Sequence, residues 1–225
     1  KTMRKLLLVS PHSDDILFSA ANFLFATNDF FKFDKIVLFT VENNEKRLAE
    51  DNVLKEIFNL QDIITSKSLV EADISYYHYY KEMNFKDFNL KDAEACINDY
   101  FGKEKAEEIE TEVYDTVKEY VDENYTVVSC LGVGHPTHYL VRKATENLAD
   151  YFYRDFPHSY KRKGKKNFDE FTSDLSLVTE KKLSEEIHKL QYEIFYKTYK
   201  TQRSLLFFEK GYIDKNLPEQ FYSKS

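Results

Sequence analysis

The chain has 225 residues, of which 42% are hydrophobic and 32% charged, so it can bury a sizeable core and is not intrinsically disordered. It contains only 5 glycines and neither a GxGxxG nor a GxxxxGK[ST] pattern, which excludes a glycine-rich phosphate-binding loop. The net charge of −7 argues against a nucleic-acid partner, and no apolar run is long enough to span a membrane.

Strands and helices alternate along the chain to about residue 156. The expected strands cover 6–10, 35–41 and 125–131, with weaker candidates at 74–80 and 175–179. The expected helices cover 14–27, 46–60, 90–100, 103–122, 137–152 and 180–201. In the helix over 46–60 we expect Leu48, Val53, Leu54 and Ile57 to form the buried stripe.

This alternation predicts a doubly wound α/β fold, with a mainly parallel sheet covered by helices on both faces. We expect one Rossmann-like domain over 1–225, with a helical or loop insertion around 80–123 and a C-terminal helical region over 180–225. The cysteines Cys96 and Cys130 form no CxxC pair. That favours a reducing compartment, so we expect a cytoplasmic protein.

A first cluster of polar residues, Pro11 to Asp15, follows the first predicted strand. His12 and Asp15 are three residues apart and face the same way if the turn is helical. They then offer an imidazole and a carboxylate to one metal ion, and the carboxylate of Asp14 is left free. A serine or aspartate at a helix start is more often a simple cap, so this cluster gains weight only with a second one.

The second cluster, Gly134 to His138, follows the strand over 125–131. His135 and His138 are also three residues apart, and Pro136 fits the first turn of a helix. An isolated HxxH pattern is a weak signal. Two such clusters at the carboxyl ends of buried strands predict a metal site, because ligands of doubly wound sheets bind at those ends.

Together the clusters supply His12, Asp15 and His138 as metal ligands. Three protein ligands with an open position for water are typical of a catalytic zinc site. A metal lowers the pKa of bound water toward neutrality, and Asp14 is placed to take the proton of that water. His135 is then available to stabilise an oxyanion or to protonate a leaving amine. This assembly suits hydrolysis of an amide.

These motifs resemble those of the LmbE-like, or PIG-L, family of zinc-dependent N-deacetylases. The family's first motif, [AP]-H-P-D-D-E, is matched by residues 11–16 (Pro-His-Ser-Asp-Asp-Ile), and its H-P-D-H by residues 135–138 (His-Pro-Thr-His). An R-x-x-E pattern is matched by residues 47–50. Segments 85–90 and 199–202 are similar to later family segments. The matches run in family order over most of the chain.

The resemblance implies an LmbE-like fold and removal of an acetyl group from an N-acetylated amino sugar such as N-acetylglucosamine, or from its conjugate. It implies Zn²⁺ as the cofactor, with another divalent metal such as Fe²⁺ as an alternative. The implied roles by position are zinc ligands at His12, Asp15 and His138, the general base at Asp14, the oxyanion stabiliser or acid at His135, and substrate contacts at Arg47 and Asp87. For Arg47 the alternative is a surface pair with Glu50, and for Asp87 an ordinary loop position.

The chain departs from the family pattern at Ser13, Ile16 and Thr137, which stand where the family has Pro, Glu and Asp. None of these changes removes a ligand or the base, but they alter the surroundings that tune metal affinity. Two other functions therefore stay open. One is a carbohydrate-binding or scaffold protein with a degenerate site, and the other is a metal-dependent phosphoesterase, although such enzymes often use two metals.

The expected partner is a small molecule, namely an N-acetylated sugar or a nucleotide-sugar or glycan conjugate. The basic run at 161–166 is most simply a solvated loop, but beside the site it would suit a phosphate of such a conjugate. The aromatic run at 76–80 suits either a packed strand or sugar stacking. The sequence is compatible with a homo-oligomer and does not decide the oligomeric state.

Overall fold

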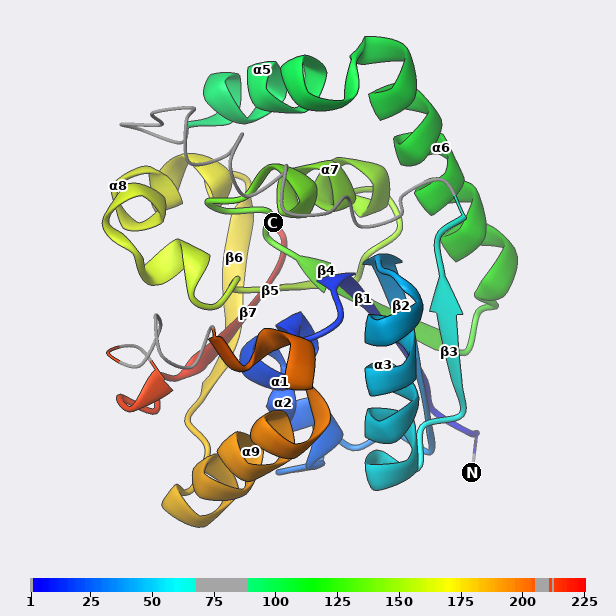
Figure 1. Cartoon of the computed structure of the whole chain (residues 1–225), viewed down its shortest axis with the longest axis vertical. Coiled ribbons are helices and arrows are strands. Elements are labelled where there is room, and N and C mark those ends of the chain that lie inside the picture. The colour runs from blue at the N-terminus through cyan, green and yellow to red at the C-terminus, as the bar shows by residue number, and fades with distance from the viewer. Residues whose placement is uncertain (1, 68–88, 205–210, 212) are drawn as a thin grey trace.

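The computed structural model describes residues 2–67, 89–204, 211 and 213–225. One sheet of 7 strands runs through this part of the chain, in the order β3-β2-β1-β4-β5-β7-β6 (Figure 1). The strands are β1 (Lys5–His12), β2 (Lys35–Glu42), β3 (Asp62–Thr65), β4 (Tyr125–Cys130), β5 (Tyr151–Tyr153), β6 (Leu175–Lys181) and β7 (Glu219–Lys224). Strands β1 to β5 pair in parallel, whereas β7 pairs antiparallel with β5 and β6. The predicted α/β fold with a mainly parallel sheet is confirmed.

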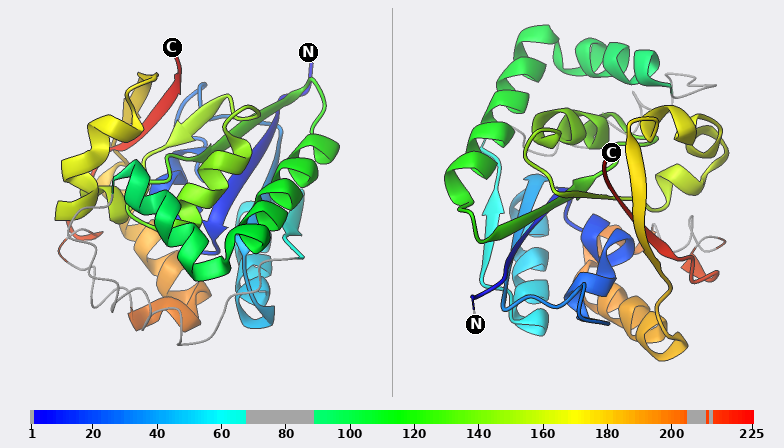
Figure 2. Two further views of the ribbon diagram at one scale, coloured as in Figure 1. Left: turned by 90° about the horizontal axis from the view of Figure 1, so that it is seen from above. Right: turned by 180° about the vertical axis from the view of Figure 1, so that it is seen from behind.

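Helices cover the two faces of the sheet (Figure 2). One layer holds α1 (Asp15–Ser19), α2 (Ala21–Leu24), α3 (Glu45–Phe58) and α9 (Glu185–Thr198). The other holds α5 (Leu90–Phe101), α6 (Lys103–Tyr120) and α7 (Pro136–Thr145), which pack on one another. The remaining helical segments are η1 (His158–Tyr160), which contacts α8 (Arg162–Phe171), and η2 (Lys200–Gln202) after α9.

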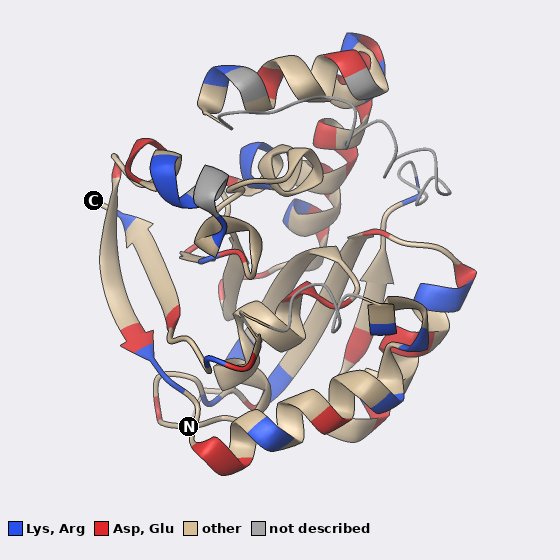
Figure 3. Cartoon of the chain, turned by 60° about the vertical axis from the view of Figure 1, so that its left-hand side comes forward, with Lys and Arg blue, Asp and Glu red and all other residues tan. Residues whose placement is uncertain are grey.

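The core lies between the sheet and these layers. Leu6 to Val9 of β1 have no exposed surface, as expected for a central strand covered on both sides. Lysine, arginine, aspartate and glutamate gather on the helices and at strand ends, while the middles of the strands are uncharged (Figure 3). Among the described residues, none of the helices is both long enough and apolar enough to cross a membrane.

The helix expected over 14–27 is two short helices, α1 and α2, that meet at Ala20. Glu219 of β7 reaches this junction, where its carboxylate accepts hydrogen bonds from the backbone N–H groups of Ala21 and Asn22. These donors begin α2 and have no partner inside their own helix. The break therefore depends on a residue about 200 positions away, which the local pattern does not reveal.

The buried stripe expected for α3 is wrong at two positions, because Val53 and Ile57 are each 47% exposed. The buried face holds Arg47, Glu50, Asp51 and Leu54 instead. This face contacts polar groups such as Thr40 and the Tyr199 hydroxyl. The periodicity of apolar residues therefore predicts the wrong buried face for this helix. The helix itself begins where expected, with the Asn44 side chain accepting the N–H of Arg47 at 3.0 Å.

Two further expectations for the second half of the chain need correction. The helix expected over 137–152 ends at Thr145, and Tyr151–Tyr153 form strand β5. The region 180–225, expected to be helical, contains α9 but ends in strand β7. Both strands are short, and their Phe152 and Phe221 are buried at the junction of β5 and β7. The strand expected over 74–80, with its aromatic run, lies outside the described residues.

Candidate metal centre

The two predicted clusters meet at the carboxyl edge of the sheet, because β1 and β4 are parallel neighbours. His12 is the last residue of β1, and Asp15 begins α1 after a short turn. The Asp15 carboxylate turns back onto the strand end, where its Oδ2 accepts the backbone N–H of His12 at 2.7 Å. This contact fixes the carboxylate beside the His12 ring.

The turn from β4 into α7 brings the second cluster to the same place. Gly132 and Gly134 both adopt a left-handed backbone, with φ of 82° and 80°. A Cβ at Gly132 would lie 2.8 Å from Cβ of Arg142, and one at Gly134 would lie 3.0 Å from the backbone oxygen of His158. Glycine is therefore needed twice for this tight turn, which ends at His135, the N-cap of α7.

Three ligand atoms form a nearly equilateral triangle. Nδ1 of His12 lies 3.2 Å from Oδ2 of Asp15 and 3.2 Å from Nε2 of His138, and the last two atoms are also 3.2 Å apart. A tetrahedral ion with bonds of about 2.0–2.1 Å places its ligand atoms roughly 3.3–3.4 Å from one another. The donor set and its spacing thus fit a divalent ion such as zinc.

Each histidine of the triangle is held from its outer side by a carboxylate. Nε2 of His12 lies 3.0 Å from Oε2 of Glu42, and Nδ1 of His138 lies 2.6 Å from Oδ1 of Asp155. A ring nitrogen that donates to a carboxylate leaves the other nitrogen free to bind a metal. Both free nitrogens face the triangle. Glu42 and Asp155 are functional candidates that the motifs did not reveal.

Asp14 lies at the N-cap of α1 and is 8% exposed. Burial raises the pKa of its carboxyl group, and the neighbouring Asp15 raises it further, whereas the charge of Arg47 lowers it. Arg47 is itself 8% exposed and lies on the buried face of α3. Arg47 is thus directed toward the site, and the surface position considered as an alternative is wrong.

His135 is the fourth imidazole of interest, and its ring centroid lies 4.8 Å from that of His12. Its Nδ1 accepts the backbone N–H of Thr137 at 3.2 Å. A neutral ring with Nδ1 as acceptor carries its proton on Nε2. Burial and the nearby His12 and His138 lower the pKa of His135 well below its usual range. His135 is therefore a neutral hydrogen-bond donor.

Ring nitrogens of His12, His135 and His138 also lie within 4.8 Å of one another, which suggests a second choice of ligands. The Thr137 contact argues against His135 in that role, because it occupies the lone pair of Nδ1 and leaves Nε2 protonated. Cys130, His138 and Asp155 form another such group. Burial raises the pKa of the Cys130 thiol well above its usual value, so it stays protonated and donates to the His138 carbonyl oxygen.

His158 belongs to neither motif, yet its ring lies 5.1 Å from that of His135 and 4.9 Å from that of His138. Behind Asp14, Asp51 accepts hydrogen bonds from Thr40 and Tyr199 at 2.8 and 3.0 Å. The segment after α9 thereby joins α3 next to the site. Asp87 lies outside the described residues.

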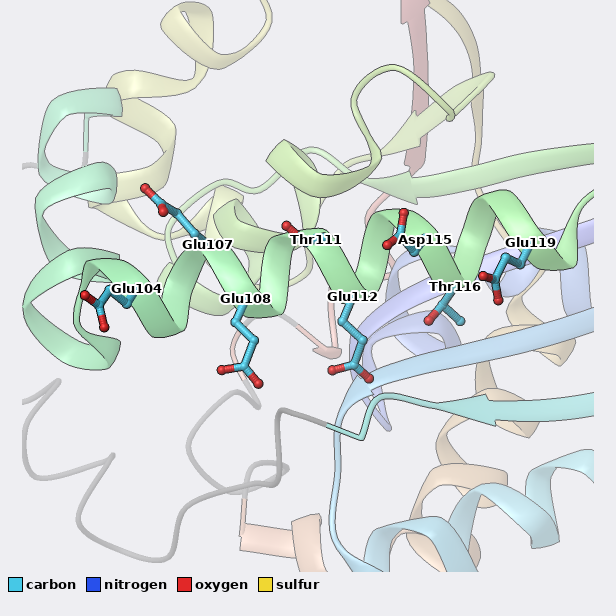
Figure 4. A pocket seen from close by; sticks show the side chains of 8 residues that line it. All are labelled: Glu104, Glu107, Glu108, Thr111, Glu112, Asp115, Thr116 and Glu119. Atoms are coloured by element: carbon cyan, nitrogen blue, oxygen red, sulfur yellow. The ribbon is translucent and has the colours of Figure 1, made fainter.

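A separate hollow lies along one face of α6 (Figure 4). It is lined by Glu104, Glu107, Glu108, Thr111, Glu112, Asp115, Thr116 and Glu119. No histidine lines it, and it is formed along a single helix rather than at the strand ends. This hollow is an acidic face of one helix, and the candidate site remains at β1 and β4.

No protein-family model matches the sequence, and no curated protein matches it either. Solved structures do match in fold. A triple mutant of a deacetylase from the teicoplanin biosynthetic pathway has a TM-score of 0.62 at 15% identity, with 98% of each chain covered. The A40926 pseudoaglycone deacetylase Dbv21 has a TM-score of 0.60 at 18% identity, with 99% of this chain and 97% of that chain covered.

The chain has the fold of these deacetylases. A zinc-inhibited form of teicoplanin deacetylase Orf2 gives the same result, with a TM-score of 0.59 at 16% identity and 98% of each chain covered. The fold implied by the resemblance to LmbE-like N-deacetylases is thereby confirmed. At these identities the likeness establishes the fold alone.

Proposed function

We propose that the protein is a metal-dependent amide hydrolase that removes an acetyl group from an N-acetylated amino sugar or its conjugate. The observation that carries this proposal is the triangle of His12, Asp15 and His138 with mutual distances of 3.2 Å, beside the buried Asp14. The fold shared with structures named as teicoplanin and A40926 deacetylases supports it.

His12, Asp15 and His138 would hold the metal, for which zinc suits the two imidazoles and one carboxylate, with Fe²⁺ as the alternative. A divalent ion bound there supplies a Lewis acid for the amide carbonyl and lowers the pKa of water toward neutrality. These three side chains would leave one position of a tetrahedral site open for water or substrate.

Asp14 is the general base in this proposal. Its raised pKa, caused by burial and by Asp15, brings the carboxyl group closer to neutral pH, where a base both accepts and returns a proton efficiently. Asp14 takes the proton of the attacking water and delivers it to the amine nitrogen as the C–N bond breaks. The charge of Arg47 lowers the pKa of Asp14 and so favours the ionised form that acts as the base.

His135 stabilises the oxyanion of the tetrahedral intermediate. Its Nε2–H is the donor, because its Nδ1 accepts the N–H of Thr137. A neutral imidazole that donates in a fixed direction suits this role better than that of an acid, since its pKa lies well below 6.5. Arg47 and Asp87 are proposed to contact the sugar or its conjugate.

The test is acetate release from N-acetylglucosamine conjugates by zinc-loaded protein, together with the Asp14→Asn variant. We expect this variant to lose about 10²- to 10⁴-fold in kcat, the usual worth of a general base, and to keep its zinc. Asp62→Asn is the control, because Asp62 is an exposed aspartate at the start of β3, at the edge of the sheet opposite the site. Full activity of Asp14→Asn would exclude the base role.

Other results would point to the other functions. Hydrolysis of phosphoesters with two metals per chain would indicate a phosphoesterase. Sugar binding that survives a chelator, without acetate release, would indicate a binding protein.

A further inference from the structure

The most informative contact that the proposed mechanism does not use is that of Glu42. We infer that Glu42 is the positioning residue that fixes the orientation and tautomer of His12, and that Thr137 holds Glu42 in that role. The inference rests on the metal site of the proposed function, and it concerns the affinity for the ion rather than the substrate.

The backbone already brings the two residues together. His12 ends β1 and Glu42 ends β2, and the two are register partners across this parallel pair. Their side chains therefore leave adjacent strand ends at the same edge of the sheet. Glu42 is 2% exposed, so its carboxylate must be satisfied by protein groups rather than by solvent.

Oε2 of Glu42 contacts one residue from each motif. It lies 3.0 Å from Nε2 of His12, and it accepts the hydroxyl of Thr137 at 2.8 Å. The hydrogen bond from His12 places the ring proton on Nε2. Nδ1, which faces Asp15 and His138 at 3.2 Å, then carries the lone pair that a metal requires.

Thr137 explains how the carboxylate is kept in place. Its side chain has no exposed surface, and its hydroxyl is a donor without charge. An aspartate at this position, as in the H-P-D-H pattern, would put a second carboxylate within hydrogen-bonding distance of Glu42, and the two charges would repel. The threonine at position 137 thus avoids a second carboxylate beside Glu42 and donates a hydrogen bond to it instead.

The experiment measures the zinc dissociation constant of metal-free protein by competition with a chromophoric chelator. We expect Glu42→Leu, which has no acceptor, to weaken zinc binding by about 10- to 100-fold. Glu42→Gln keeps an acceptor without the charge, so we expect it to recover part of this loss. Glu50→Gln is the matched control, because Glu50 is also buried, at 8% exposed, but its carboxylate accepts hydrogen bonds from Thr201 rather than from a histidine.

A second measurement follows the ring of His12 by NMR of histidine labelled with ¹⁵N. In the zinc-bound wild type we expect the His12 proton on Nε2, and in Glu42→Gln a weaker hydrogen bond with a smaller downfield shift of this proton. If Glu42→Leu does not fold, the Gln variant alone decides. Zinc affinities of Glu42→Gln and Glu50→Gln within about twofold of the wild type, with an unchanged His12 signal, would overturn the inference.

The outcome is separable from that of the proposed function. A wild-type protein that binds one zinc but releases no acetate would contradict the deacetylase proposal, and the role of Glu42 would still be decided by the affinities. A wild-type protein that binds no zinc would overturn both the metal site and this inference.

Discussion

Thr137 donates its backbone N–H to Nδ1 of His135 at 3.2 Å, within the first turn of α7. A histidine that caps its own helix cannot turn freely, and its remaining N–H points in one direction. The two histidines of the HxxH pattern therefore have different roles. His138 directs the lone pair of Nε2 into the triangle, whereas His135 is a hydrogen-bond donor through its Nε2–H.

The first prediction concerns His135. We expect His135→Ala to lower kcat by about 10²- to 10³-fold, the usual effect of removing one oxyanion donor, while zinc content stays at the wild-type level. Elemental analysis and acetate release on the same preparation check this. Loss of zinc from His135→Ala would mean that His135 is a ligand. His158→Ala is the comparison, because His158 touches the same rings from the neighbouring segment.

The second prediction concerns Asp155, whose Oδ2 accepts the N–H of Val133 while Oδ1 faces His138. In Asp155→Asn the amide oxygen is held by Val133, so its NH₂ group faces Nδ1 of His138. That donor favours the tautomer with the proton on Nε2, which cannot bind a metal. We expect zinc binding about 10- to 100-fold weaker.

The control for Asp155 is Asp150→Asn. Asp150 also accepts a backbone N–H through its carboxylate, from Val127, and it precedes β5, at the edge of the sheet opposite the site. Zinc affinity should be unchanged in this variant. Equal losses in both variants would show that the effect on Asp155 is structural.

The third prediction is a dependence of stability on pH that arises from Asp51. Burial raises the pKa of Asp51 to about 7 from the ordinary 3.8, against the hydrogen bonds from Thr40 and Tyr199. The folded protein then holds a proton that the unfolded chain has lost, so this contribution to stability is full below about pH 4 and falls until about pH 7. About three pKa units correspond to roughly 4 kcal/mol as an upper limit.

Urea unfolding of the wild type and Asp51→Asn at several pH values measures this contribution, because the asparagine cannot titrate. We expect the free energy of unfolding of the wild type to fall, relative to that of Asp51→Asn, as the pH rises from 4 to 7. Above pH 7 the difference between the two proteins should be constant. A constant difference over the whole range would mean that folding does not raise the pKa of Asp51.

The fourth prediction compares two glycines with nearly the same backbone. Gly132 and Gly102 have φ of 82° and 79°, but an added Cβ meets Arg142 and Tyr139 at Gly132 and nothing within 4 Å at Gly102. Gly102→Ala should cost about 1–2 kcal/mol from the backbone alone. Gly132→Ala should cost a further 1–3 kcal/mol from overpacking, measured by thermal unfolding. Equal costs would contradict the close approach of α7.

Much of the site could be predicted because its residues lie in short segments. His12, Asp14 and Asp15 follow one strand and His135 and His138 another, and parallel strands bring such ends together. The carboxylates that hold the histidines could not be found in this way. Glu42 and Asp155 belong to other strands, and their roles depend on register rather than on any spacing to the motifs.

The missed parts of the fold have a related cause. β5 is only three residues long and lies directly after a helix, so the helical pattern of α7 continued through it. The inner face of α3 is polar because it faces Asp14 and Tyr199, and a rule based on apolar periodicity selects the opposite face. In both cases a distant part of the chain decides the local structure.

The pairing of β5 with β7 has a consequence for the order of synthesis. Asp155 follows β5 directly, and β5 is bordered by β4 on one side and by residues 219–224 on the other. On the ribosome, all of the metal-site residues emerge long before β7 does. A nascent chain that ends before residue 219 therefore lacks the strand that pairs with β5 on that side. The contact between Asp155 and His138 is thus stabilised only late in translation.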